Sequence, residues 1–398
     1  MNKLPLSTVI LVLAQALNLT TAVLSVTIAA IVGGLLVDDP AYSTVPYGLQ
    51  FASVMLFTFP ASWLMKQVGR KKVFLVGACC LFLAGLCGFF AIQNHSFYGL
   101  MLAHGFLGLY IAIANFYRFA ATDGLEGKLK SSALSFVVSG GVLAAFLGPW
   151  IASHLKSVDG YRDFALCYAS LSLIAILTVA LISAWRPIIS PAASPTATAE
   201  VSAQKPLGLS VTFAIVAAAW GYFCMNLLMI QSSLMMHASV AFEHVSHAMS
   251  SHVLAMFLPS FFVGYLIQYM GERRLILLGY FALFIVTYVN LFYQGYQAIY
   301  TSLIVLGIGW NFMYVAGGAL LTKQLNANNT HRWQGINDTM IALLATLGAF
   351  LPAPLLATLG WKMTNLVLLS LTICLLLGFA LAASSTFTTK FSLGKAKL

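Results

Sequence analysis

Residues 187–208, PIISPAASPTATAEVSAQKPLG, interrupt a chain that otherwise consists mostly of long apolar stretches. The segment is rich in Pro, Ser, Ala and Thr, a composition typical of a linker. Six stretches long enough to span a bilayer, about 20 apolar residues each, precede it, and six follow it. The sequence therefore predicts an all-α membrane protein with two six-helix halves, 1–186 and 209–385, joined by a cytoplasmic linker and followed by a cytoplasmic tail, 386–398.

The composition excludes other classes of protein. Of the 398 residues, 60% are apolar and only 8% are charged, whereas soluble proteins carry about 25% charged residues. The net charge of +10 is scattered between apolar stretches, so it does not form a nucleic-acid-binding face. The twelve predicted spans are 6–36, 44–65, 73–93, 97–121, 132–154, 163–185, 209–235, 247–269, 275–293, 297–322, 335–357 and 362–384.

The basic residues predict the orientation. If the N-terminus is cytoplasmic, sixteen of the 20 Lys and Arg lie in cytoplasmic segments. Lys156, Arg162 and Lys362 fall on the opposite side, and Arg118 lies near the inner end of the fourth stretch. Cytoplasmic loops of membrane proteins carry an excess of Lys and Arg. We therefore expect a multi-pass protein with both termini in the cytoplasm.

The sequences of the two halves also resemble each other weakly. Residues 115–117, Asn-Phe-Tyr, in the fourth stretch correspond to residues 311–313, Asn-Phe-Met, in the tenth. Two related six-helix halves are typical of transporters, which bind their substrate near mid-membrane between the halves. We find no catalytic constellation of side chains. The pattern therefore favours a transporter over an enzyme and predicts no cofactor.

Two motifs resemble those of the major facilitator superfamily. Residues 68–72, VGRKK, resemble the end of the superfamily's loop motif between helices 2 and 3. Gly140, Gly148 and Pro149 resemble part of its helix 5 motif. The resemblance covers nearly the whole chain and implies the twelve-helix major facilitator fold. Lys66 departs from the motif, because the superfamily usually has an acidic residue there.

Three charged residues are candidates for an inner gate. Arg70 in the loop motif is expected to pair with Asp123 at the end of the fourth stretch. Arg118 lies close to the cytoplasm, where it either serves this gate or extends its charge to the membrane surface. The expected cavity-lining residues are polar or aromatic and lie on four predicted spans: Asn18, Asn115, Tyr222, Asn226, Trp310 and Tyr314.

Sulfur and imidazole side chains recur at helical spacing in the seventh and eighth stretches. Met225 and Met229 are four residues apart, as are His252 and Met256, and residues at this spacing share one face of a helix. At about 1.5 Å per residue, antiparallel spans bring Met225 level with Met256, and Met229 level with His252. Thioether sulfur and neutral imidazole bind Cu(I) well. The pattern indicates a copper site, although Met also fills gaps in apolar cores.

These two motifs resemble the paired signatures of the bacterial CcoA-like copper importers, a branch of the major facilitator superfamily. The resemblance implies alternating-access copper import across the bacterial inner membrane, with copper as substrate and Met225, Met229, His252 and Met256 as its ligands. Copper and membrane lipid are the expected partners, with a cytoplasmic copper acceptor as a further candidate. The residues proposed to capture copper lie further out: His237, Met249, His244 and His247.

Two alternatives remain open at the level of sequence. Close relatives of the copper-importing branch carry riboflavin, and Tyr222, Trp310 and Tyr314 could stack on such an aromatic solute. A membrane receptor or assembly factor that only holds copper is the other alternative. Copper flux into vesicles that contain only this protein would distinguish a transporter from a receptor.

Overall fold

The computed structural model describes residues 5–121, 123, 125, 127–186, 208–325 and 330–395. All regular structure in this part of the chain is helical, as predicted. The first group of helices comprises α1 (Leu6–Leu35), η1 (Pro40–Tyr42), α2 (Val45–Val68), α3 (Arg70–Gln93), α4 (Phe97–Ala114), α5 (Tyr117–Ala120), α6 (Gly127–Leu155) and α7 (Ala165–Ala184). The second comprises α8 (Leu209–His237), α9 (Phe242–Phe257), η2 (Leu258–Phe261), α10 (Val263–Met270), α11 (Glu272–Phe292), α12 (Tyr296–Gln324), α13 (Thr330–Phe350), α14 (Pro352–Thr358) and α15 (Gly360–Lys395).

Each of the twelve predicted spans coincides with a helix or with a broken helix. Nine helices of the described chain are long and apolar enough to cross a membrane, and two bent pairs raise the number to eleven. The described apolar part of α6, Gly140–Leu155, is shorter. The all-α membrane fold predicted from the sequence is confirmed. Residues 187–207 of the predicted linker lie outside the described residues.

The structure corrects two spans that the sequence predicted as continuous. The eighth is broken at η2, where Pro259 lies, and bends by 56°. The eleventh bends by 47° before Pro352. Proline lacks a backbone N–H and clashes with the preceding turn of a helix, which explains both breaks. The fourth predicted span remains a single span, Phe97–Ala120, with a turn at Asn115 and Phe116 between α4 and α5.

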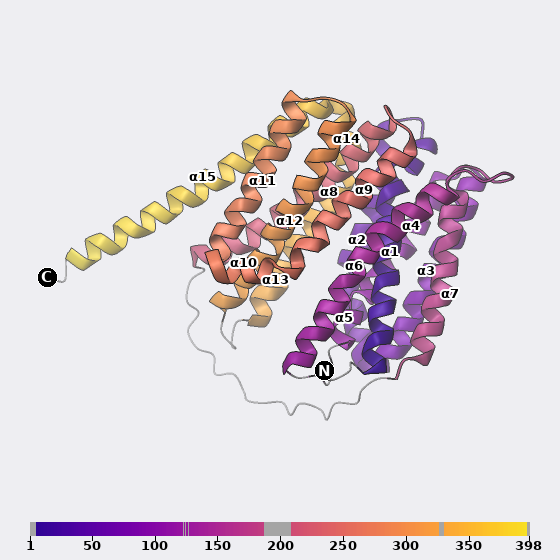
Figure 1. The fold of residues 1–398 in the computed structure, drawn as a ribbon, viewed down its shortest axis with the longest axis horizontal. Helices are drawn as coiled ribbons and strands as arrows, with labels where there is room; N and C mark the ends of the chain where they lie inside the picture. Colours follow the sequence, from indigo (N-terminus) through magenta and orange to yellow (C-terminus); the bar gives the residue numbers. More distant parts are fainter. Residues whose placement is uncertain are drawn as a thin grey trace.

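The two groups of helices lie side by side, the first drawn in indigo to magenta and the second in rose to yellow (Figure 1). We call the end where α1 finishes and α2 begins the distal end, and the opposite end the proximal end. The groups contact each other through α6 with α9, α2 with α13, η1 with α14, and α1 with α8 and α9.

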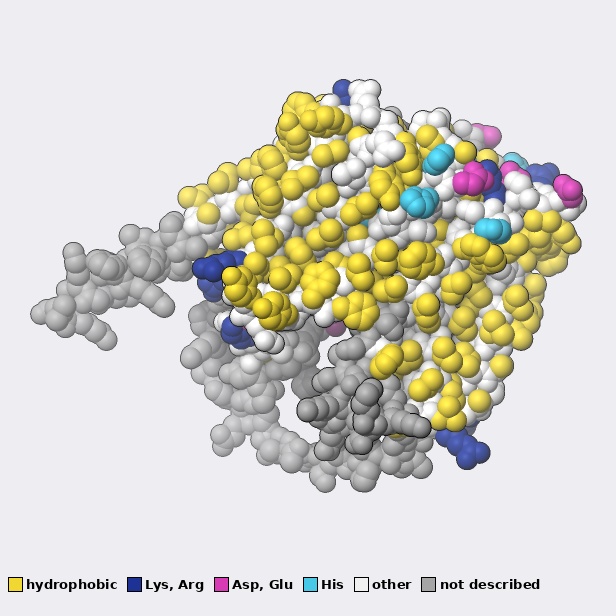
Figure 2. Space-filling model, viewed as in Figure 1, with side chains coloured by type: hydrophobic (Ala, Val, Ile, Leu, Met, Phe, Trp, Pro, Cys, Tyr) yellow, Lys and Arg dark blue, Asp and Glu magenta, His cyan; other side chains and the backbone are white. Residues whose placement is uncertain are grey.

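The outer surface is that of a membrane protein. Hydrophobic side chains cover most of the face in Figure 2, and charged side chains gather towards its edges. Large apolar residues such as Leu173, Ile176 and Phe281 are exposed. A soluble monomer rarely exposes continuous apolar surface of this extent, so this surface is suited to contact with lipid.

Candidate functional site

Three aromatic side chains form a cluster on the second group of helices. Trp310 and Tyr314 lie one turn apart on α12, and their rings stack with centroids 5.2 Å apart and an interplanar angle of 11°. The Tyr222 ring on α8 meets both edge-on, at 5.1 Å from Trp310 and 5.2 Å from Tyr314. Stacked and edge-to-face arrangements are the favoured geometries of aromatic pairs. The structure thus brings together the three aromatic residues predicted from the sequence.

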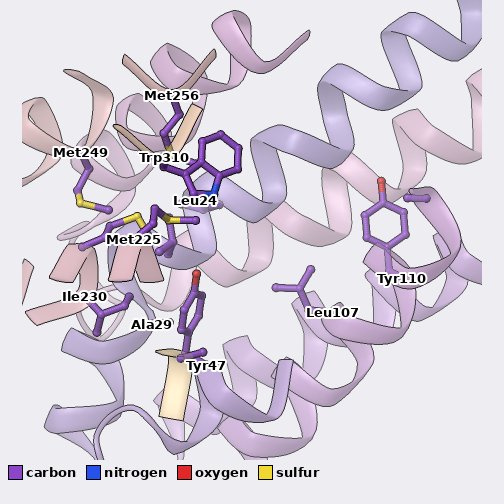
Figure 3. Close-up of a cluster of buried hydrophobic side chains, with 14 of the residues drawn as sticks. Leu24, Ala29, Tyr47, Leu107, Tyr110, Met225, Ile230, Met249, Met256 and Trp310 are labelled. Carbon is purple, nitrogen blue, oxygen red and sulfur yellow. The ribbon is translucent and has the colours of Figure 1, made fainter. Parts of the chain in front are cut away.

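This aromatic cluster, Tyr222, Trp310 and Tyr314, has an unused hydrogen-bond donor. The indole Nε1 of Trp310 is buried and has no partner in the described part of the chain. In Figure 3 this nitrogen and the Tyr47 hydroxyl of α2 are directed into the same region. A buried donor without a partner is costly, which marks this position as one that a ligand can satisfy.

Charged residues of both groups of helices lie within electrostatic range of Tyr222 in the aromatic cluster. Tyr222 interacts electrostatically with Arg118 of α5, in the first group, and with Asp338 of α13, in the second. The sequence did not predict that Arg118 and Asp338 both lie near Tyr222, because the two residues are far apart in the chain. Tyr222 therefore lies near charged side chains of both groups of helices.

The sulfur and imidazole side chains of the predicted copper site are all buried. Met225 and Met229 lie on α8, and Met249, His252 and Met256 lie on α9. Figure 3 shows Met225, Met249 and Met256 in the same apolar cluster as Trp310. His252 Nδ1 lies 2.6 Å from the carbonyl oxygen of Leu303 on α12.

The tautomer of His252 follows from this contact. A carbonyl oxygen only accepts hydrogen bonds, so Nδ1 carries the proton and donates. The other ring nitrogen, Nε2, is then an acceptor, and it is buried without a partner among the described residues. Histidine ligands of metal ions commonly donate their second nitrogen to a backbone carbonyl in this way.

The histidines predicted to capture copper contact aromatic rings. His247 stacks on Tyr300 with a centroid distance of 5.7 Å, and the His244 ring lies 5.3 Å from Tyr296. His237 meets Phe242 edge-on. In the described residues, no group of three or more His, Cys, Asp and Glu is placed to hold a metal ion. The capture role of these histidines stays a prediction.

The predicted polar cavity residues have different surroundings. Asn226 is buried, and its side-chain amide donates to the carbonyl of Ala345, which ties α8 to α13. Asn115 caps α4 at the break before α5. Asn18 on α1 is buried, and its side-chain oxygen lacks a partner in the described chain. Asn226 therefore has a structural contact that the sequence pattern did not reveal.

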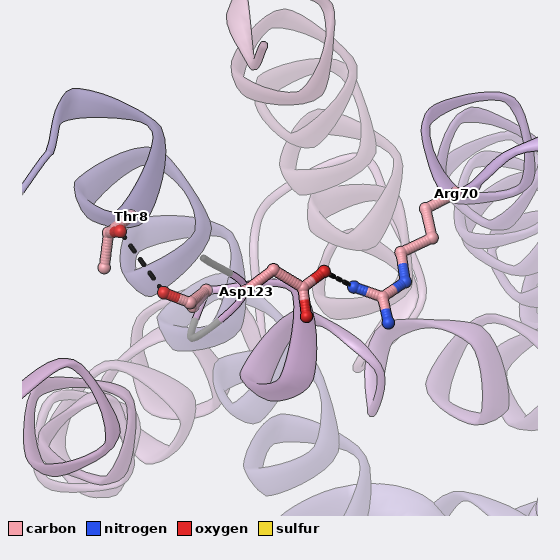
Figure 4. Close-up of polar contacts among 4 residues, drawn as sticks. Thr8, Arg70 and Asp123 are labelled. Carbon is pink, nitrogen blue, oxygen red and sulfur yellow. Dashed lines mark hydrogen bonds and ion pairs between the residues drawn. The ribbon is translucent and has the colours of Figure 1, made fainter. Parts of the chain in front are cut away.

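Arg70 and Asp123 form an ion pair at the proximal end of the first group (Figure 4). The hydroxyl of Thr8 on α1 donates to the carbonyl of Ala121, in the same turn as Asp123. The Arg118 guanidinium lies over the Phe119 ring, 4.7 Å from its centroid. The second group has a counterpart that the sequence analysis missed: Lys323 and Glu272, 2.9 Å apart.

At the distal end the two groups are in close contact. The Thr44 hydroxyl donates to the carbonyl of Phe350 over 2.8 Å, joining the start of α2 to the end of α13. One turn on, a Cβ at Gly48 would lie 2.2 Å from the Phe350 ring. The Lys156 ammonium lies 5.1 Å from the centroid of the Phe242 ring, across the groups. These contacts close the distal end in this conformation.

Comparisons with known proteins agree with this architecture. Residues 209–395 match the sequence model of the Major Facilitator Superfamily. Over 363 residues the chain is 29% identical to the riboflavin transporter RfnT of Brucella anthropi, and the match covers 90% of each protein. A shorter match, 28% identical over 118 residues, covers 29% of this chain and 27% of the uncharacterized MFS-type transporter YdeG of Bacillus subtilis.

Solved structures show the same arrangement of helices. A bacterial homolog of the human lysosomal transporter Spinster, in an inward-facing and occupied conformation, superposes with a TM-score of 0.69 at 15% identity, covering 96% of this chain and 97% of that one. The nucleoside transporter NupG superposes with a TM-score of 0.66 at 15% identity, covering 94% and 98%. This chain has the major facilitator fold.

The comparisons also bear on the expected substrate. They point to a membrane transporter of the major facilitator type rather than an enzyme, but they do not support the copper-importing branch that the Met and His motifs indicated. The relative that matches this chain over most of its length is named for riboflavin. Short Met and His motifs carry less information than a likeness over 363 residues.

Proposed function

We propose that this transporter carries a flat heteroaromatic solute such as riboflavin by alternating access. The observation on which the proposal rests is the aromatic cluster with its unpartnered Trp310 N–H. The isoalloxazine ring of riboflavin offers a broad π-face for stacking and carbonyl oxygens that accept a hydrogen bond. A relative covering 90% of the chain is named as a riboflavin transporter, which supports the same substrate class.

The position of the aromatic cluster fits the transport cycle. Arg118 and Asp338, from the two groups of helices, lie within electrostatic range of Tyr222, and transporters of this architecture bind substrate between their halves. We propose that residues 1–186 and 209–385 are the halves that rock, with residues 187–208 as the cytoplasmic linker. We further propose that the protein lies in a bacterial inner membrane with both termini cytoplasmic.

Uptake of labelled riboflavin into vesicles that contain only this protein tests the proposal. We expect saturable uptake that an excess of unlabelled riboflavin suppresses. A simple sugar alcohol such as ribitol, which lacks the ring system, should not compete. Absence of riboflavin uptake by protein that is folded and correctly inserted would refute the proposal.

Copper import is a second candidate function, favoured by one observation. The buried Nε2 of His252 is an acceptor without a partner among the described residues, and buried methionines surround the same part of α8 and α9. A soft monovalent ion such as Cu(I) suits thioether and imidazole ligands. Copper would then be the substrate, and a cytoplasmic copper acceptor would be a partner.

Replacing His252 or Met225 with Leu distinguishes the two candidates. If copper is the substrate, we expect cellular copper accumulation to fall by about tenfold or more, since loss of even an outer-shell partner of a metal ligand lowers metal affinity about 10–100-fold. If riboflavin is the substrate, copper accumulation should not change in either variant. Met313→Leu is the control, because Met313 is equally buried on α12 but lies outside the proposed ligand set.

A further inference from the structure

A groove lies between the two groups of helices near the distal end, where α6 faces α9. Its volume is about 500 Å³, and its lining is mostly apolar. Phe146, Leu147 and Trp150 of α6 form one wall and are exposed. Ser246 and Ser250 of α9 lie on the opposite wall. Each wall of the groove therefore belongs to a different group of helices.

The length of the groove matches one leaflet of a bilayer. On α6 the lining extends from Phe146 to His154, which is about 12 Å at 1.5 Å per residue, and the hydrocarbon core of one leaflet is about 15 Å thick. The groove ends where α6 finishes at Leu155 and α9 begins at Phe242. A molecule that fills it must have an apolar chain inside the membrane and a polar group at the distal membrane surface.

Two ring stacks mark the level of that surface. Trp150 packs on His154 with ring centroids 4.4 Å apart. On the opposite wall His247 stacks on Tyr300 of α12 at 5.7 Å. Trp and Tyr are enriched where membrane proteins meet the lipid headgroups. The distal part of the groove therefore lies at headgroup depth, on a surface that is otherwise largely apolar (Figure 2).

Two polar side chains of the groove have no partner of their own. Ser246 is 4% exposed, and its hydroxyl makes no hydrogen bond to any described residue. Glu243 lines the distal part of the groove and is exposed. The ion pairs found among the described residues do not include it. A buried hydroxyl without a partner is costly, so a ligand oxygen beside Ser246 would remove that cost.

Both signs of charge occur at the distal rim of the groove. The Lys156 ammonium lies 5.1 Å from the centroid of the Phe242 ring, and Glu243 is the next residue after Phe242. His154 Nδ1 lies 2.9 Å from the carbonyl oxygen of Trp150, so Nδ1 donates and Nε2 is left as an acceptor. One cation, one anion and one neutral acceptor suit a zwitterionic headgroup that carries N–H donors.

We propose that a phospholipid of the distal leaflet with a primary ammonium headgroup, such as phosphatidylethanolamine, binds in this groove. Its acyl chain lies along the apolar wall of α6. Its ammonium donates to Glu243 and His154, its phosphate lies near Lys156, and Ser246 donates to a lipid oxygen. A choline headgroup has no N–H to donate, and a glycerol headgroup has no positive charge.

The bound lipid bridges the two groups of helices, because its contacts lie on both walls. Separation of α6 from α9 at the distal end breaks these contacts. A ligand shifts a conformational equilibrium towards the state that it binds better. The lipid therefore favours the distal-closed conformation, whichever solute the transporter carries.

Photoreactive lipids test the site in the full-length protein held in nanodiscs. The nanodiscs contain equal amounts of phosphatidylethanolamine, phosphatidylcholine and phosphatidylglycerol with the same acyl chains, and each lipid in turn carries a photoreactive acyl chain. Mass spectrometry of crosslinked peptides from α6 and α9 reports occupancy. We expect phosphatidylethanolamine to label these two helices about two- to fivefold more than phosphatidylcholine, the range for one exposed ion pair.

Glu243→Gln keeps the size of the side chain but removes its charge, so we expect it to abolish this preference. Asp159→Asn is the matched control, since Asp159 is another exposed acidic residue near the distal end and lies outside the groove lining. Three results would overturn the proposed headgroup: equal labelling by the three lipids, stronger labelling by phosphatidylglycerol, or an unchanged preference in Glu243→Gln. Labelling spread evenly over all helices would overturn the groove as the site.

Distances between spin labels at the distal ends of the two groups test the bridging role. Without any solute, we expect a larger distal-closed population in phosphatidylethanolamine nanodiscs than in phosphatidylcholine nanodiscs, and no such difference in Glu243→Gln. Equal populations of the wild-type protein in the two lipids would overturn the bridging role. Because no riboflavin is present, these failures are distinguishable from failure of riboflavin transport.

Discussion

Replacing Trp310 with alanine is expected to lower riboflavin uptake by about tenfold or more. The substitution removes the ring that stacks on Tyr314 and meets Tyr222, and it also removes the unpartnered indole N–H. Stacking of an aromatic side chain on a heteroaromatic base contributes about 1–3 kcal/mol, and about 1.4 kcal/mol corresponds to a tenfold change in affinity. Initial uptake rates over a range of riboflavin concentrations measure the effect.

Two further variants separate stacking from general loss of structure. Trp310→Phe keeps a ring but removes the N–H, so we expect a smaller loss that appears as weaker apparent affinity. Phe281→Ala is the control, because Phe281 is an exposed aromatic residue on α11 and lies on the surface suited to contact lipid. Equal loss in Phe281→Ala and Trp310→Ala would mean that the aromatic cluster has no special role in binding.

Gly48→Val is expected to disfavour the distal-closed conformation by about tenfold or more. A Cβ at this position would lie 2.2–2.3 Å from two atoms of the Phe350 ring, and overpacking of this kind costs about 1–3 kcal/mol. The ring lies on α13, across the interface between the groups. Because alternating access requires both conformations, we expect uptake to fall. Distances between labels at the distal ends measure the shift in population.

A second substitution should reverse this effect. Phe350→Ala removes the ring that the new side chain meets, so the double variant is expected to recover distal closure and part of the uptake. Gly105→Val is the matched control, since a Cβ at Gly105 on α4 would meet nothing within 4 Å. An uptake loss in Gly48→Val without any change in label distances would contradict a role at the distal interface.

Sequence periodicity located the spans well but not their breaks. Apolar length alone marks a spanning helix, because the bilayer requires about 20 apolar residues and internally satisfied backbone groups. The break near Pro259 had a sequence signal in the proline itself, yet Pro60 and Pro149 lie inside continuous helices. Which proline interrupts a helix depends on what packs around it.

The candidate site was predictable only in part. Residues four apart on one helix, such as Trp310 and Tyr314, are neighbours by helical geometry, so their stacking could be anticipated from spacing. The groove between α6 and α9 could not, because its two walls belong to different groups of helices, far apart in the chain. The backbone carbonyl that fixes the tautomer of His252 likewise lies 51 residues away from it.

The sequence by itself therefore determined that this chain is a helical membrane protein, where its spans begin and end to within several residues, and which side chains share a helix face. These properties follow from local length, hydropathy and periodicity. Only the tertiary structure decided which faces meet across the two groups of helices and which buried polar atoms are satisfied. Those outcomes depend on close packing between segments distant in the chain, as when the Gly48 backbone meets the ring of Phe350.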